Sequence, residues 1–155
     1  MRDMKVMKIL AICLAVLALA ACSGEKATLP EPEALYEEIR NSVELPAMSD
    51  VAEYMLESDT GILPDEHDGA VYYIPDAGMA PDQIIIVRAK DTAGAAEVEK
   101  KLNAWLDYQE ENARVYLTEY MPLLQAGIVR RDDLTVSLIV SEKAEEIVKI
   151  YQQYI

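Results

Sequence analysis

The sequence predicts an α+β protein in which a four-stranded, mostly antiparallel sheet carries two long helices on one face. Two pairs of short apolar segments, each pair with turn residues between its members, are typical of β-hairpins. Each pair is followed by a segment whose apolar residues recur at helical spacing. A single sheet with both helices on one face is the simplest way to bury these helical stripes. Short N-terminal helices are expected to precede this hairpin, helix, hairpin, helix unit.

Two short helices are expected before the sheet. The first covers residues 32–43, because Pro32 suits the first turn of a helix and apolar residues follow it every three or four positions. Asp50 followed by Glu53 is typical of a helix N-terminus and predicts a second, short helix. An acidic loop over residues 57–69 then leads to the first hairpin.

The first hairpin is expected to pair strands 70–74 and 83–89. The second of these strands is apolar at nearly every position, as in an interior strand that is covered on both sides or shielded on one by the N-terminal helices. Asp91 is a typical N-cap for the long amphipathic helix that follows. Pro122 is expected to stop or bend that helix.

The second hairpin is expected to pair strands 128–130 and 134–140. The last strand alternates apolar and polar residues, which predicts one core-facing side. The turn between these strands is charged, and Arg130 and Arg131 beside the two aspartates indicate a charged hairpin tip. Ser141 is expected to cap a closing helix with an apolar stripe.

The N-terminus has the pattern of an exported protein. Residues 1–8 carry Arg2, Lys5 and Lys8, and residues 9–18 form an apolar run. This run falls short of the roughly 20 apolar residues that span a bilayer, so the pattern favours a secretory signal peptide.

The sequence Leu19-Ala20-Ala21-Cys22 resembles the lipobox of bacterial lipoproteins. The resemblance implies that the Cys22 thiol receives a diacylglyceryl group and that the chain is cut after Ala21. Two acyl chains would anchor the protein durably, whereas one chain holds a protein only marginally.

Two other interpretations of the N-terminus stay open. The small residues Ala18 and Ala20 also satisfy the rule for ordinary signal cleavage, which would leave Cys22 free near the new terminus. An uncleaved membrane anchor is the other alternative. The lipobox interpretation divides the chain into a signal peptide (1–21), a lipidated cysteine with a polar, proline-containing linker (22–32) and a single globular α+β domain (33–155).

The charge and cysteine content narrow the classes of function. Loss of residues 1–21, with three cations and Asp3, removes a net charge of +2 and takes the chain from −14 to −16, which makes nucleic acid an unsuitable partner. Cys13 leaves with the signal peptide and lipid occupies Cys22, so no disulfide is expected in the domain. His67 is the one histidine, which removes catalytic triads and histidine-rich zinc sites from consideration. We therefore expect no catalytic residues and no cofactor.

The acidic loop contains the candidates for a metal site. Its carboxylates are hard oxygen ligands of the kind Ca²⁺ prefers, and the weak candidates are Asp59, Asp65, Glu66 and Asp68. Because their spacing fails the template of a helix-loop-helix calcium loop, a solvated acidic turn is the favoured interpretation.

The nine tyrosines in a chain with no phenylalanine suggest a stacking platform for sugars as a further alternative. Tyr72 and Tyr73 are neighbours in one predicted strand and are expected to point to opposite faces, so only one of them can join such a platform. Most of the others are expected to be half-buried core aromatics.

The strand over residues 84–90, the long helix after it, Tyr120-Met121-Pro122 and the final hairpin together resemble the lipoprotein domain family of unknown function numbered 4358. The resemblance spans about residues 70–154. It implies a surface lipoprotein of the kind found mostly in clostridial bacteria, and the family offers no catalytic residues to carry across.

The expected function is that of a membrane-anchored, extracytoplasmic lipoprotein. Its partners would be membrane lipid, through Cys22, and an envelope protein or ligand that the sequence does not identify. We expect a non-catalytic binding or interaction module of the cell envelope. The alternatives are a small-ligand or Ca²⁺-binding lipoprotein, and a cell-wall enzyme that uses paired carboxylates.

Overall fold

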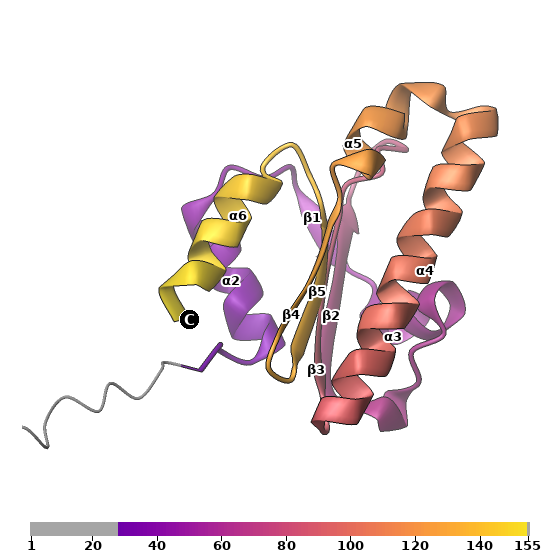
Figure 1. The fold of residues 1–155 in the computed structure, drawn as a ribbon. Coiled ribbons are helices and arrows are strands. Elements are labelled where there is room, and N and C mark those ends of the chain that lie inside the picture. Colours follow the sequence, from indigo (N-terminus) through magenta and orange to yellow (C-terminus); the bar gives the residue numbers. More distant parts are fainter. Residues whose placement is uncertain (1–27, 155) are drawn as a thin grey trace, which may run out of the picture.

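The computed structural model describes residues 28–154, which form a five-stranded antiparallel sheet with helices on both faces (Figure 1). The strand order is β1-β2-β3-β5-β4, and all neighbours are antiparallel. The strands are β1 (Met48–Asp50), β2 (His67–Pro75), β3 (Gln83–Ala89), β4 (Ile128–Asp132) and β5 (Thr135–Val140). The predicted signal peptide, Ala21 and Cys22 lie outside the described residues. The predicted α+β class is confirmed.

Helices cover both faces of the sheet (Figure 1). One face carries α2 (Pro32–Ser42) and α6 (Ala144–Tyr151), and the other carries α3 (Ala52–Met55), α4 (Thr92–Tyr116) and α5 (Met121–Gln125). Short helical turns complete the chain: η2 (Leu56–Thr60), η3 (Pro64–Glu66), η4 (Thr118–Tyr120) and η5 (Gln152–Tyr154). The predicted arrangement, with both long helices on one face, is wrong.

Burial of β3 on both sides explains why the helices divide between the two faces. Ile84 and Ile86 belong to the core under α2 and α6, whereas Ile85 and Val87 belong to the core under α4. A strand that is apolar on both sides needs a cover on each. Tyr72 and Tyr73 likewise enter opposite cores, as predicted from strand alternation.

The sheet has five strands, where the sequence predicts four, because of β1. Its three residues pair with the end of β2, with Met48 opposite Pro75 and Asp50 opposite Tyr73. So short a strand shows no alternation, and the sequence there predicts only a helix cap. Asp50 serves both elements, since its Oδ1 accepts from the backbone N of Ala52, 2.9 Å away, and from that of Tyr72, also 2.9 Å away.

The boundaries of α4 confirm one predicted signal and correct another. The Asp91 side chain accepts from the backbone N of Gly94 at 2.7 Å, which caps the helix as expected. The helix ends at Tyr116, before Pro122, and this proline stands in the first turn of α5. Pro122 therefore starts a short helix, a position that suits its missing N–H.

The predicted charged tip of the second hairpin is partly buried. Arg130 holds Asp132 with two hydrogen bonds of 2.5 and 2.7 Å, and its guanidinium lies 4.4 Å from the ring centroid of buried Tyr151. The two charged side chains are only 16% and 15% exposed. Arg131 contacts Glu99 of α4 at 3.1 Å. These arginines join the edge of the sheet to its helices, so the charged hairpin tip has a structural role that the sequence did not predict.

Candidate functional site

A groove of about 770 Å³ lies at the end of the sheet beside α5. Its walls come from the segment before β3, from the η4–α5 corner and from the turn between β5 and α6. These three segments are far apart in the sequence. They meet because Gln83, at the start of β3, pairs with Val140, at the end of β5.

The apolar part of the groove consists of residues at the ends of these elements. They are Pro81, Tyr120, Pro122, Leu123 and Ile128. Tyr120, Leu123 and Pro81 are half-buried, so their apolar surfaces remain available from the groove. This floor resembles the largely apolar lining of ligand pockets, whose volumes are about 300 to 1,000 Å³.

Four carboxylates line the same groove: Asp82, Glu119, Glu142 and Glu145. Among the described residues that line it, none is a lysine, an arginine or a histidine. The nearby cation Lys143 is bound to Glu146, with Nζ and Oε1 2.9 Å apart. The groove therefore has a negative rim that favours a cationic ligand.

Asp82 is the carboxylate most affected by its surroundings. Partial burial raises its pKa above the usual value for aspartate, and the charge of Glu142 raises it further. A cation placed in the groove would relieve both effects, because it would stabilise the charged form of Asp82. A perturbed carboxylate in a groove is a recognised marker of functional sites.

The turn that joins α5 to β4, beside the groove, is closely packed around Gly127. The backbone N of Gly127 donates to the carbonyl O of Leu124 at 2.9 Å, which turns the chain from α5 into β4. A Cβ at residue 127 would lie 2.8 Å from this same carbonyl oxygen. Glycine therefore suits this tight turn, where a side chain would also press against Leu106 of α4.

The groove and the start of the described chain lie at opposite ends of β3. Arg88, near the last residue of this strand, donates to the carbonyl O of Leu29 at 2.8 Å. Asp82 precedes the first residue of the strand. Seven strand residues span roughly 20 Å, and α5, which borders the groove, lies at the other end of the sheet from the start of the described chain (Figure 1).

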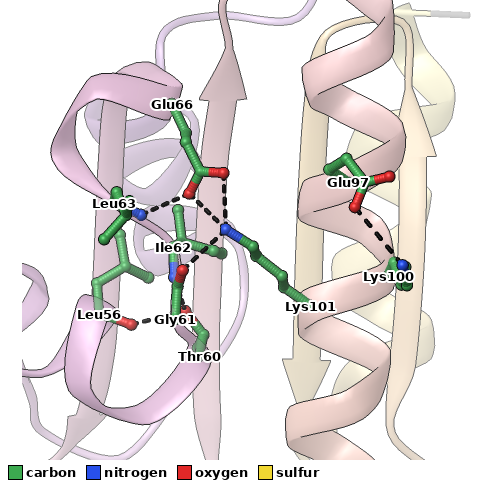
Figure 2. A network of polar contacts seen from close by, with 9 residues as sticks. All are labelled: Leu56, Thr60, Gly61, Ile62, Leu63, Glu66, Glu97, Lys100 and Lys101. Carbon is green, nitrogen blue, oxygen red and sulfur yellow. Dashed lines mark hydrogen bonds and ion pairs between the residues drawn. The ribbon is translucent and has the colours of Figure 1, made fainter.

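The predicted acidic loop does not form a cluster of carboxylates. Glu66 binds Lys101 Nζ through both carboxylate oxygens, at 2.7 and 2.5 Å, and accepts from the backbone N of Leu63 at 2.7 Å (Figure 2). These hydrogen bonds, the one from Leu63 first, lower the pKa of Glu66. Asp59 accepts from the hydroxyl of Tyr72 at 3.2 Å. Glu66 and Lys101 thus tie the loop to α4.

The remaining candidates of that loop are dispersed. Asp65 and Asp68 are exposed, and His67 is half-buried as the first residue of β2. Within residues 28–154, no three His, Cys, Asp or Glu side chains form a group that could hold a metal ion. Ca²⁺ binding stays a prediction for these residues.

The comparisons with known proteins give one match. Residues 41–141 match the family model described as Domain of unknown function (DUF4358). The chain belongs to the DUF4358 family. The matched range contains the whole sheet together with Asp82 and Glu119 of the groove, and ends at Ser141. No curated protein and no solved structure matches the chain.

Sequence reasoning missed the groove of this DUF4358 domain. Its carboxylates are spread from residue 82 to residue 145, and no spacing along the chain connects them. The pairing of β3 with β5, a feature of the folded structure, is what places Asp82 near Glu142.

Among the described residues, no helix has the length and apolarity needed to cross a membrane.

Proposed function

We propose that this DUF4358 protein is a membrane-anchored, extracytoplasmic lipoprotein that acts as a non-catalytic binding module of the cell envelope. Its partner would be a basic, partly apolar segment of another envelope protein, bound in the groove beside α5. The acidic, apolar-floored groove is the observation that carries the binding proposal. The lipobox-like sequence ending at Cys22 supports the anchoring proposal.

The chemistry of the groove suits lysine and arginine side chains. Their aliphatic stems pack on apolar surface while their charged groups reach carboxylates. The floor formed by Tyr120 and Leu123 offers the first contact, and Asp82 with Glu142 offers the second. The excess of acidic residues over the whole chain, 28 against 14 basic ones, would also speed the encounter with a basic partner.

The position of the groove suits a tethered binding module. A lipid on Cys22 would be joined to Leu29 by a short linker with a reach of about 15 Å. Because the groove lies at the other end of β3 from Leu29, it would face away from the membrane. A tether at one end and a groove at the other would leave the groove free for a partner in the envelope.

The binding proposal is tested with a fluorescent peptide of alternating lysine and leucine and the soluble domain from residue 28 onward. We expect saturable binding that weakens as salt is added, because charge supplies much of the attraction. The groove variant E142Q/E145Q removes two charges from the rim, and we expect about tenfold weaker binding.

The matched control is E53Q/E111Q, which changes the net charge by the same amount at two exposed carboxylates outside the groove. We expect this control to bind nearly as well as the wild type. Equal weakening in both variants would mean that the peptide recognises net charge alone, and the proposed groove function would be wrong.

A carboxylate-based hydrolase is the second candidate function, and the pair Asp82 and Glu142 is the observation that favours it. A carboxyl group with a raised pKa near a second carboxyl group is the arrangement that a general acid and base require. Release of soluble sugar fragments from isolated cell-wall polymer by the wild type, but not by D82N, would establish this candidate. Absence of release by the wild type would remove it.

A further inference from the structure

A second hollow, of about 400 Å³, lies between η2 and α4 and shares no lining residue with the groove. Ser58, Asp59 and Thr60 of η2 form one wall. Lys101, Trp105 and Tyr108 recur at steps of four and three along α4 and form the other. Two elements far apart in the sequence therefore build this hollow.

Two aromatic rings form the apolar surface of the hollow. Trp105 and Tyr108 stack with ring centroids 5.6 Å apart and planes inclined by 23°. Tyr108 remains 57% exposed, and Trp105 is half-buried beside it. The outer part of the stacked pair therefore presents aromatic surface to the hollow beside the polar side chains of Ser58 and Asp59.

A buried hydrogen-bond network fixes the orientation of Trp105. The indole Nε1 donates to Gln83 Oε1 at 2.9 Å, and Gln83 is only 2% exposed. Gln83 in turn donates through Nε2 to Oε1 of Gln109 at 2.6 Å. The indole is therefore held in place before any ligand binds, which lowers the entropic cost of binding.

The same network positions a carboxylate at the rim. Asp59 Oδ2 accepts from the Tyr72 hydroxyl at 3.2 Å, and its Oδ1 accepts from Ser58 Oγ at 3.2 Å. Burial raises the pKa of Tyr72, so this hydroxyl stays a donor at neutral pH. Each oxygen of Asp59 keeps a further lone pair for a hydroxyl group of a ligand.

The charges around the hollow are close to balanced. Lys101 Nζ binds Glu66 and the carbonyl O of Gly61, at 2.5 to 2.8 Å. Among the described residues that line the hollow, the charged ones are Lys101 and Asp59, one of each sign. This balance distinguishes the hollow from the acidic groove. It favours a neutral ligand with an apolar face and several hydroxyl groups.

We propose that the stacked Trp105–Tyr108 pair, with Asp59 at its rim, binds a neutral pyranose ring of a glycan. The C–H groups on one face of a pyranose carry a small positive charge and lie well on the negative face of an aromatic ring. Its hydroxyl groups then reach the Asp59 carboxylate and the Ser58 hydroxyl. This glycan site depends on neither the groove nor the lipid anchor.

Trp105 is the single tryptophan of the chain, so its fluorescence and its indole N–H resonance report on this site alone. The folded domain is titrated with soluble oligomers of N-acetylglucosamine and, separately, of glucose. We expect saturable changes in both signals with at least one series, and tighter binding for longer oligomers. No saturable change with either series would overturn the proposal.

Two variants locate the binding. Y108A removes an exposed ring and D59N removes the rim charge, and we expect each to weaken binding about tenfold while the circular dichroism spectrum stays that of the wild type. The matched control is Y116A, which removes another tyrosine of α4 that is 79% exposed. Equal loss in Y116A and Y108A would contradict the site, because binding would then follow tyrosine content rather than this hollow.

Discussion

Among the carboxyl groups of the groove, Asp82 is the one whose pKa is raised by its surroundings. Because burial and Glu142 raise its pKa in the folded protein, its proton is held more tightly in the folded than in the unfolded state. The contribution of Asp82 to the stability of the domain should therefore fall as pH rises from about 4 through its raised pKa.

D82N removes this titration, so its free energy of unfolding should lose this part of the pH dependence and match or exceed that of the wild type at pH 7. E142Q should lower the pKa of Asp82, as followed by carbon NMR of the carboxyl group. A pKa of Asp82 that stays the same in E142Q would contradict the coupling of these two groups.

Lys101 is the residue that ties the loop before β2 to α4. K101M should lower the free energy of unfolding by about 1 kcal/mol, because Glu66 loses a charge-assisted pair that water partly screens. Since the pKa of Glu66 is lowered in the folded protein, this contribution is present above about pH 4.3 and is lost as pH falls through the folded pKa.

Thermal unfolding measured across this pH range checks the prediction for Lys101. The matched control is K100M, since Lys100 pairs with Glu97 only on the surface, at 3.7 Å and with side chains 78% and 63% exposed (Figure 2). If K100M and K101M lowered the free energy of unfolding equally, the Lys101–Glu66 ion pair would not hold the loop before β2 on α4.

The turn between α5 and β4 is closely packed around Gly127. G127A places a methyl group against the carbonyl O of Leu124 and the side chain of Leu106, so we expect a loss of about 1 to 3 kcal/mol in the free energy of unfolding. G69A is the control, because its new methyl group would lie 3.6 Å from Pro32, at ordinary contact distance. Chemical denaturation of both variants measures the difference. A G127A variant with the free energy of unfolding of the wild type would contradict the close packing of this turn.

Local signals at this scale predict most elements well. The N-cap Asp91, the alternating strand β5 and the apolar β3 all leave marks in a few adjacent residues. β1 leaves none, because three residues are too few to show a period. The sequence does not predict how the helices divide between the two faces of the sheet. An amphipathic stripe shows which side of a helix is buried, but it does not show against which face of the sheet that side packs.

At the scale of the whole molecule, the two candidate sites are products of tertiary structure. The groove brings together segments around residues 82, 120 and 142, and the hollow brings η2 against α4. No motif of adjacent residues predicts that these segments come together in the folded protein. The sequence does contain Trp105 and Tyr108 at helical spacing, but the apolar stripe of this helix includes only Trp105, and nothing in the pattern marks Tyr108, which is more than half exposed.

The proposed lipoprotein would have a groove at one end of its sheet and a lipid tether near the other. Its central claim, that the domain works while anchored to a membrane, rests on Cys22. C22A should abolish lipid attachment and release the protein from the membrane fraction, because two acyl chains supply the anchoring free energy.

Mass spectrometry of the N-terminal peptide, taken from protein purified out of bacterial membranes, tests the anchoring most directly. The account predicts a chain that begins at Cys22 and carries a diacylglyceryl group on its sulfur. A chain that retains residues 1–21, or that carries an unmodified Cys22, would contradict it.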